Sequence, residues 1–267
     1  MSTKLKIAAA VAAAVLLSAC SSPKHEPMPL VKFTPSMEVT EVWSKGLSSA
    51  EGFLVPAVYD DMVFAAGGKT LTRLNARTGE TEWSVSFNSP ITRGVGSDGY
   101  VTAVGLWDGN LEVVDAEGKV SWEKKLTTEL ASPPVVSHGL VIARTMDTRV
   151  SAFEASSGEL QWTYQRSQPA LTVRLPTRML AHDNFLLVGQ PNGHIVILDI
   201  ASGKPMFEFQ VAQAKGVTEV ERLVDVVGAP AFSDNLVCAA AFQGAVTCVD
   251  STNGQTRWTQ KIDAVAG

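Results

Sequence analysis

The sequence predicts an all-β chain that folds as a β-propeller of four-stranded antiparallel blades, and three observations support this prediction. Tryptophans recur at nearly constant spacing, since Trp43, Trp83, Trp122 and Trp162 lie 40, 39 and 40 residues apart. A turn motif that contains a glycine precedes each of the later tryptophans. Short runs rich in Val and Thr, bounded by Gly, Asp and Asn, lie between these motifs and are typical of β-strands.

The turn motif combines a carboxylate or carboxamide, a glycine three or four residues later, and an aromatic residue beyond the glycine. The carboxylate can accept hydrogen bonds from backbone amides of the turn, and the glycine can adopt a positive φ. We therefore expect the first residue to form a turn and the tryptophan to pack between neighbouring blades, without a chemical role for either. The five copies are Asn75–Gly79–Trp83, Asp115–Gly118–Trp122, Glu154–Gly158–Trp162, Asp199–Gly203–Phe207 and Asp250–Gly254–Trp258.

Each repeat also carries the strands of one blade. In the first repeat, strands are expected at residues 62–66 and 70–75, after a turn at Asp60 and Asp61. A sheet of about forty residues cannot bury both of its faces alone, so neighbouring sheets must pack radially. The Gly-His and Trp-Asp signatures of WD40 propellers are missing, and the pattern resembles the quinoprotein-type, PQQ-like repeat instead.

The number of repeats predicts an incomplete ring. Trp43 resembles the last strand of a blade but has no repeat of its own before it, which suits a ring closed by an N-terminal strand. The fifth repeat nevertheless has its own aromatic strand, at Trp258. Six such strands for five blades do not close a ring, so we expect about three further repeats and read the sequence as a fragment.

The N-terminal residues are typical of an export signal. Lys4 and Lys6 precede an apolar run over residues 7–17, which is shorter than the roughly twenty residues that a membrane-spanning helix needs. The run ends in Leu-Ser-Ala before Cys20 and resembles the lipobox of bacterial lipoproteins, in which the cysteine is acylated and becomes the mature N-terminus. An ordinary signal peptide with an incidental cysteine is the alternative. Ser21, where an aspartate would resemble an inner-membrane retention signal, favours the outer membrane.

Three segments are therefore expected along the chain. Residues 1–19 form the lipoprotein signal peptide, residues 20–38 form the lipidated cysteine and a flexible tether, and residues 39–267 form the partial propeller. Charged residues make up 18% of the chain and the net charge is −5, which argues against a nucleic-acid-binding protein with a basic face.

Two connections between blades are unusually long, at residues 163–175 and 208–228. They flank one blade and emerge on one face of a propeller, so we expect them to form a single surface for docking another protein. The alternative is that 171–173 and 220–227 are strands packed inward. The surface residues are expected to be Leu171, Val173, Arg174, Leu175, Val220, Arg222, Leu223, Asp225 and Val226.

At these loops the chain resembles the BamB family of outer-membrane β-barrel assembly lipoproteins. The likeness runs through the whole chain and is closest at residues 132–141, 169–174 and 212–226. It implies an eight-bladed propeller that faces the periplasm and binds the POTRA domains of BamA together with other subunits of the assembly machinery. It assigns no enzymatic activity.

The resemblance also implies which side chains contact BamA. The family's first-loop motif of two aliphatic residues and an arginine matches Leu171, Val173 and Arg174. Its second-loop pair of carboxylates matches at Asp225, whereas Val227 stands at the second position. The aliphatic side chains are expected to bury apolar area, and Arg174 and Asp225 to fix the register by charge-assisted hydrogen bonds.

The main alternative is a pyrroloquinoline-quinone dehydrogenase, because such enzymes use the same repeat. That chemistry needs a Ca²⁺ site and, in many members, two adjacent cysteines, and the sequence has no adjacent cysteines. Gly-x-Ser-x-Gly, Walker and His-Glu-x-x-His motifs are missing as well, and the four histidines are scattered. We therefore expect no enzymatic activity, no cofactor and no metal site.

Cys238 and Cys248 lie on the two arms of a hairpin around Gln243 and Gly244. A three-residue loop centred on Gln243 would place the cysteines directly opposite each other, within reach of a disulfide. A two-residue turn at Gln243 and Gly244 would shift the register by one and place them on opposite faces. The periplasm permits the bond, which would act as a staple and not as a redox centre.

Overall fold

The computed structural model describes residues 31–48, 54–167 and 169–261. The expected signal peptide and Cys20 lie outside these residues. The chain divides into two units, Met1–Glu41 and Val42–Gly267, whereas the sequence suggested a boundary between residues 38 and 39. The described part of the first unit, residues 31–41, is exposed and contains no helix or strand. Within the described ranges, no helix is long and apolar enough to cross a membrane.

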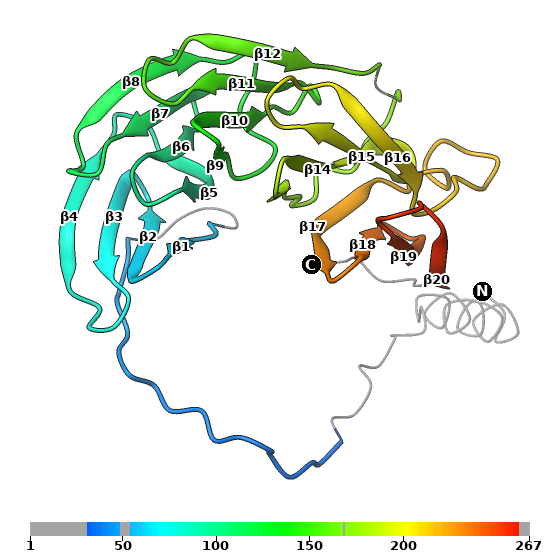
Figure 1. Ribbon diagram of the computed structural model, residues 1–267, viewed down its shortest axis with the longest axis horizontal. Helices are drawn as coiled ribbons and strands as arrows, with labels where there is room; N and C mark the ends of the chain where they lie inside the picture. The colour runs from blue at the N-terminus through cyan, green and yellow to red at the C-terminus, as the bar shows by residue number, and fades with distance from the viewer. Residues whose placement is uncertain (1–30, 49–53, 168, 262–267) are drawn as a thin grey trace, which may run out of the picture. The chain divides into compact units, whose positions relative to one another are not determined.

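The second unit contains five four-stranded antiparallel sheets, numbered here as blades 1 to 5 in chain order. Figure 1 shows the blades one after another along an arc that stays open between the first and the last. A short 3-10 turn, η1 (Pro191–Gly193), connects two strands of blade 4. The strands are β1 (Ala57–Tyr59), β2 (Met62–Gly67), β3 (Thr70–Asn75) and β4 (Thr81–Ser86); β5 (Ile91–Ser97), β6 (Thr102–Leu106), β7 (Asn110–Val114) and β8 (Val120–Lys125); β9 (Val135–Ser137), β10 (Leu140–Arg144), β11 (Val150–Glu154) and β12 (Leu160–Tyr164); β13 (Leu180–His182), β14 (Phe185–Gln190), β15 (His194–Asp199) and β16 (Pro205–Gln210); and β17 (Val226–Ser233), β18 (Leu236–Ala241), β19 (Ala245–Asp250) and β20 (Thr256–Lys261).

The fold class and the four-stranded blade are therefore confirmed. Strands β2 and β3 fall where the first repeat placed them, with Met62 opposite Asn75 and Gly67 opposite Thr70. The turn between β1 and β2 contains Asp60 with a positive φ of 48°, a conformation that aspartate tolerates better than most residues.

The hydrophobic core lies between the blades. Because side chains alternate between the two faces of a strand, each blade presents apolar residues to both of its neighbours. Four apolar clusters result, and each combines side chains of two successive blades. Between blades 1 and 2, for example, Phe64 and Leu71 pack with Ile91 and Val104. Burying one such side chain contributes about 1.5–3 kcal/mol, so the interfaces hold the blades together.

The repeated tryptophan connects each blade to the next. The indole nitrogen of Trp83 in blade 1 donates a hydrogen bond to the carbonyl of Ala116 in blade 2, at 2.9 Å. The indole ring lies against Gly118, where an added Cβ would come within 2.8 Å of it. The same arrangement joins Trp43 to Ala76 and Gly79, Trp122 to Ala155 and Gly158, and Trp162 to Ile200 and Gly203.

The motif is therefore an inter-blade contact, in which the glycine makes room for the tryptophan of the preceding blade. The first residue of the motif forms the turn, as predicted. Oδ1 of Asp115 accepts hydrogen bonds from the backbone amides of Glu117 and Lys119, at 3.1 and 2.8 Å. Glycine at position 118 has a φ of 83°, which an L-residue with a side chain rarely adopts.

Two tryptophans depart from the prediction. Trp43 contacts Ala76 and Gly79 of blade 1, but residues 40–44 are not a strand, because no described strand pairs with them. Trp258 was expected to pack between blades, yet its side chain is 47% exposed. No strand follows β20 within the described residues, so no turn glycine lies against Trp258.

Phe207 of blade 4 stands where the other repeats have tryptophan. It packs against Gly254 of blade 5 but has no indole N–H to donate to the carbonyl of Ser251. An apolar pocket, open to solvent, lies at this interface and is lined by Phe207, Phe185, Phe232 and Ser251 among others.

Phe207→Trp is expected to stabilise the protein by about 1 kcal/mol, because the indole fills part of the pocket and gains the missing hydrogen bond. The midpoint of urea unfolding should rise accordingly. Phe185→Trp is a matched control, since Phe185 lines the same pocket and is equally exposed at 42%. An unchanged or lower midpoint for Phe207→Trp would show that the interface does not accept an indole.

The hairpin between β18 and β19 has a three-residue loop, with Ala240 opposite Val246 and Cys238 opposite Cys248. Gln243, at the centre of the loop, has a positive φ of 46°. Of the two alternatives, the structure therefore adopts the register that aligns the cysteines, and a disulfide joins them. Cys248 is fully buried, which suits a bond that staples the hairpin.

Candidate functional site

Two long loops flank blade 4. The first covers residues 165–179 between β12 and β13, and the second covers residues 211–225 between β16 and β17. In an antiparallel blade, the connection to the next blade leaves from the same end as the turn between the second and third strands. Both loops therefore lie on the face that also carries the β10–β11 turn and the β14–β15 turn.

The first loop presents the predicted side chains. Leu171 is 46% exposed, Arg174 is exposed, and Val173 is half-buried. Residues 171–175 form no strand, so the inward-packed alternative does not describe this loop. The loop ends at β13, a few residues beyond the predicted end at Leu175, because residues 176–179 are not paired within blade 4.

The second loop has an exposed tip and a buried end. At the tip, Oε2 of Glu221 accepts hydrogen bonds from the amides of Val217 and Thr218, at 2.9 and 3.0 Å. Oγ1 of Thr218 accepts one from the amide of Glu221 at 3.3 Å, so the two residues close the turn by reciprocal hydrogen bonds. These hydrogen bonds lower the pKa of Glu221 and hold Val217 and Val220 in solvent, 97% and 63% exposed.

The end of the second loop packs inward, so the inward-packed alternative holds for residues 224–227 but not for residues 220–223. Val224, Val226 and Val227 are 4%, 5% and 3% exposed, and β17 already begins at Val226. Val227 stands at the position of the second carboxylate in the family that the sequence resembles. Its burial suits an apolar side chain.

The carboxylate of Asp225, at the end of the second loop, binds the backbone of the first loop. Oδ2 of Asp225 accepts a hydrogen bond from the amide of Val173 at 2.5 Å, and Oδ1 accepts one from the amide of Asn192 at 3.4 Å. The side chain is 6% exposed. The sequence placed Asp225 at the docking surface as a direct contact, and this burial does not fit that role. The structure instead uses Asp225 to fix the position of Val173 and so of its neighbour Arg174.

The electrostatic environment of Asp225 includes one buried cation. Burial raises the pKa of Asp225, and the amides of Val173 and Asn192 and the charge of Arg144 oppose this rise only in part. Burial also lowers the pKa of Arg144 to about 10, against the opposite effect of Asp225. Arg144 therefore remains protonated at neutral pH.

The loops are tied to their surroundings at two further points. The amide of Arg178 donates to the carbonyl of Gly228, and the amide of Gly228 donates to the carbonyl of Pro176, both at 2.9 Å. Arg166 forms an ion pair with Glu208 of β16 at 2.7 Å. The backbone that carries Leu171 and Arg174 is thus held by blades 4 and 5.

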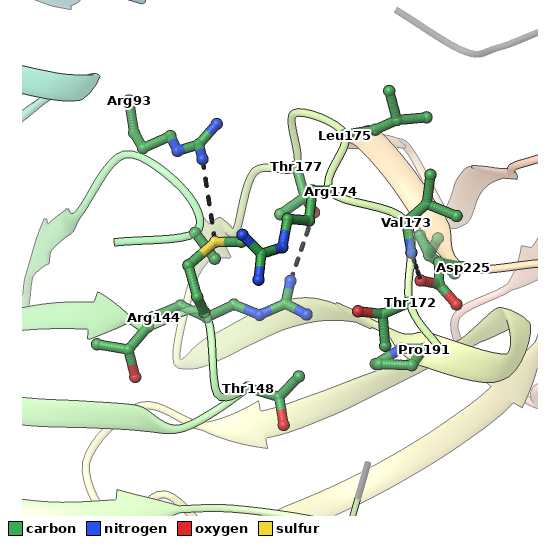
Figure 2. A pocket seen from close by; sticks show the side chains of 14 residues that line it. Arg93, Arg144, Thr148, Thr172, Val173, Arg174, Leu175, Thr177, Pro191 and Asp225 are labelled. Atoms are coloured by element: carbon green, nitrogen blue, oxygen red, sulfur yellow. Dashed lines mark hydrogen bonds between the residues drawn. The ribbon is translucent and has the colours of Figure 1, made fainter. Parts of the chain in front are cut away.

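A small pocket, open to solvent, lies beneath the first loop. Val173, Arg174 and Asp225 line it, so three of the four predicted partner-binding residues meet at one place, while Leu171 does not line it. Figure 2 shows that Arg93 and Arg144 reach the same pocket from other blades. Neither arginine was predicted from the sequence. One sign was available, since Arg144 ends an otherwise apolar strand.

No group of three or more metal-ligating side chains occurs within the part of the chain that the structure describes. His182 stacks on Phe232 with ring centroids 3.9 Å apart, and the ring of His194 contacts the carbonyl of Asn192 at 2.9 Å. Both histidines are therefore placed by local packing and turn contacts.

Comparison with known proteins identifies the relatives of this chain. The model of a family described as outer membrane protein assembly factor BamB matches residues 67–267. The BamB of Burkholderia pseudomallei is 37% identical over 265 residues, which cover 97% of this chain and 70% of that protein. The BamB of Bordetella pertussis is 34% identical over 259 residues, which cover 94% of this chain and 67% of that protein.

Two solved structures are similar to this chain. The crystal structure of BamB from Moraxella catarrhalis matches with a TM-score of 0.72 and 27% identity, over 82% of this chain and 68% of that chain. A quinohemoprotein alcohol dehydrogenase from Comamonas testosteroni matches with a TM-score of 0.63 and 19% identity, over 80% of this chain and 43% of that chain. At that identity the second likeness shows the propeller fold alone.

Proposed function

The chain belongs to the BamB family of outer-membrane protein assembly factors, and on that premise we propose that it is a non-catalytic scaffold that binds the POTRA domains of BamA. Its role is in outer-membrane protein assembly, as the names of its relatives state. We also propose that acylated Cys20 anchors it to the outer membrane on the periplasmic side. The lipobox-like sequence before Cys20 supports acylation of this cysteine. Several acyl chains hold a protein stably at a membrane.

The proposal rests on one observation: the two long loops are joined to each other on one face of the chain. The hydrogen bond between Asp225 and Val173 holds them together on one face, where Leu171 is half exposed and Arg174 is exposed. Val217 and Val220 add apolar area at the internally bonded tip of the second loop. A fixed surface that combines aliphatic side chains with an arginine suits a protein interface, because little conformational entropy is lost when it binds.

In this proposal, Leu171 buries apolar area against the partner and Arg174 makes charge-assisted hydrogen bonds to it. Asp225 acts as a positioning residue inside the protein, and Val173 contributes the backbone amide that Asp225 holds. The role is proposed as non-catalytic because the exposed side chains of this surface suit binding to another protein and not the making of covalent bonds.

Leu171→Ala and Arg174→Glu should each weaken binding to the purified POTRA domains of BamA by about 30-fold or more, the usual effect of removing a central interface residue. Isothermal titration calorimetry gives the Kd directly. Arg178→Glu is the matched control, because it makes the same charge change at an exposed residue of the same loop. If Arg174→Glu binds as tightly as Arg178→Glu, the first loop is not the docking surface.

A further inference from the structure

The pocket beneath the first loop gathers positive charge from distant parts of the chain. Arg93 comes from blade 2, Arg144 from blade 3 and Arg174 from the first loop, and Asp225 is the only acidic residue among the fourteen that line the pocket. Figure 2 shows the three arginine side chains reaching into the same space. Each guanidinium group carries a positive charge, so an anion that enters this pocket would be attracted by all three.

Arg144 is the most informative of the three. It is 5% exposed, and its Nε is buried and has no hydrogen-bond partner among the described residues. Its one hydrogen bond there, from Nη1 to Oγ1 of Thr177, is long at 3.4 Å. It forms no ion pair with Asp225 within 4.0 Å. A buried guanidinium with so few protein partners is unusual, and it retains the capacity to donate hydrogen bonds to an anion.

The backbone of blade 2 directs Arg93 toward the same pocket. Arg93 lies in an irregular part of β5, where the pairing with β6 shifts between Thr92 and Val95, and its φ is 67°. A positive φ at a non-glycine residue is strained, and such residues concentrate at functional sites. Nε of Arg93 donates to the carbonyl of Leu130 at 3.2 Å, and this bond fixes the guanidinium at the pocket.

We propose that this pocket binds a carboxylate of the docked partner, an aspartate or glutamate side chain that enters beneath the first loop and meets Arg144, Arg93 and Arg174. The planar fork of an arginine matches the two oxygens of a carboxylate, so the guanidinium groups that line the pocket can bind it through paired hydrogen bonds. The inference rests on the proposed function for the identity of the partner, because a protein docked on Leu171 brings its side chains to the mouth of this pocket. It assigns a binding role to Arg93 and Arg144.

The first test needs no partner and uses sodium acetate as the probe. The Tm of the purified chain should rise by about 2–4 °C in acetate relative to sodium chloride at equal ionic strength. The rise should disappear in Arg144→Gln and in Arg93→Gln, and persist in Arg178→Gln, whose exposed side chain does not line the pocket. If Arg144→Gln does not fold, Arg93→Gln gives the same comparison. The absence of a rise in wild type, or a rise with sodium phosphate but not with acetate, would overturn the proposal.

The second test measures the partner. Arg144→Gln and Arg93→Gln should weaken binding to the POTRA domains by about tenfold or more, whereas Arg178→Gln should bind like wild type. A lost acetate response with unchanged POTRA binding would refute the assignment of the carboxylate to the partner. If wild type responds to acetate but does not bind the POTRA domains, the proposed function fails while the carboxylate pocket stands.

Discussion

Gly158→Ala is expected to lower the free energy of unfolding by about 2–4 kcal/mol, a large effect for one added methyl group. Two terms add. The φ of Gly158 is 70°, a conformation that costs alanine about 1 kcal/mol. The new Cβ would also come within 2.8 Å of the Trp122 ring, so the indole must move and strain its 2.8 Å hydrogen bond to Ala155.

Gly139→Ala separates these two terms. Gly139 has nearly the same φ, 72°, but no atom lies within 4 Å of its added Cβ. It should therefore lose only the conformational part, about 1 kcal/mol. Urea unfolding of the two variants measures the difference directly. Equal losses would mean that the glycine of the repeat is required by the turn alone and not by the tryptophan of the preceding blade.

Glu112→Gln is expected to stabilise the protein in a pH-dependent way. Glu112 lies in β7, is 8% exposed, and faces Glu123 across the pair with β8. Burial, together with the negative charges of Glu123 and Asp108 and a side-chain hydrogen bond with Glu123, raises the pKa of Glu112 to about 7.

The folded state therefore binds a proton that the unfolded state releases, since the ordinary pKa of this group is 4.5. The contribution of protonated Glu112 to stability is complete below that ordinary pKa and is lost as the pH rises through the folded pKa of about 7. Glutamine resembles the protonated form at every pH. Its advantage over wild type should be small near pH ~5 and on the order of 2 kcal/mol near pH ~8.5.

Chemical unfolding of wild type and variant at both pH values tests this. Glu117→Gln is the control, because Glu117 is exposed in the neighbouring turn and its loss should not change the pH dependence. The same difference between Glu112→Gln and wild type at both pH values would show that Glu112 is ionised throughout.

Much of the fold could be predicted because its determinants are local. A strand is signalled by its own residues, and the turn motif combines a hydrogen-bond acceptor and a glycine within five residues, as at Asn75 to Gly79. The interval between tryptophans then sets the size of a blade. The position of Phe207 was predicted in the same way, although the pocket left at that interface was not, because the pocket depends on the packing of two blades.

The candidate site was predictable only in part. Loop lengths can be counted along the chain, so the two loops beside blade 4 and the exposed Leu171 and Arg174 could be anticipated. The burial of Asp225 could not, because it depends on the amide of Val173, which is distant in sequence. Nor could the meeting of Arg93 with Arg144, since no local pattern encodes the approach of separate blades.

The sequence by itself determined the repeated blade, the residues that form its turns, and the length of the loops on one face. The tertiary structure decided between the two registers of the Cys238–Cys248 hairpin, moved Asp225 from the surface to the interior, and brought the arginines together. The physical reason is the range of the interactions. Turns and strand patterns depend on neighbours along the chain, whereas burial and electrostatic environment depend on neighbours in space.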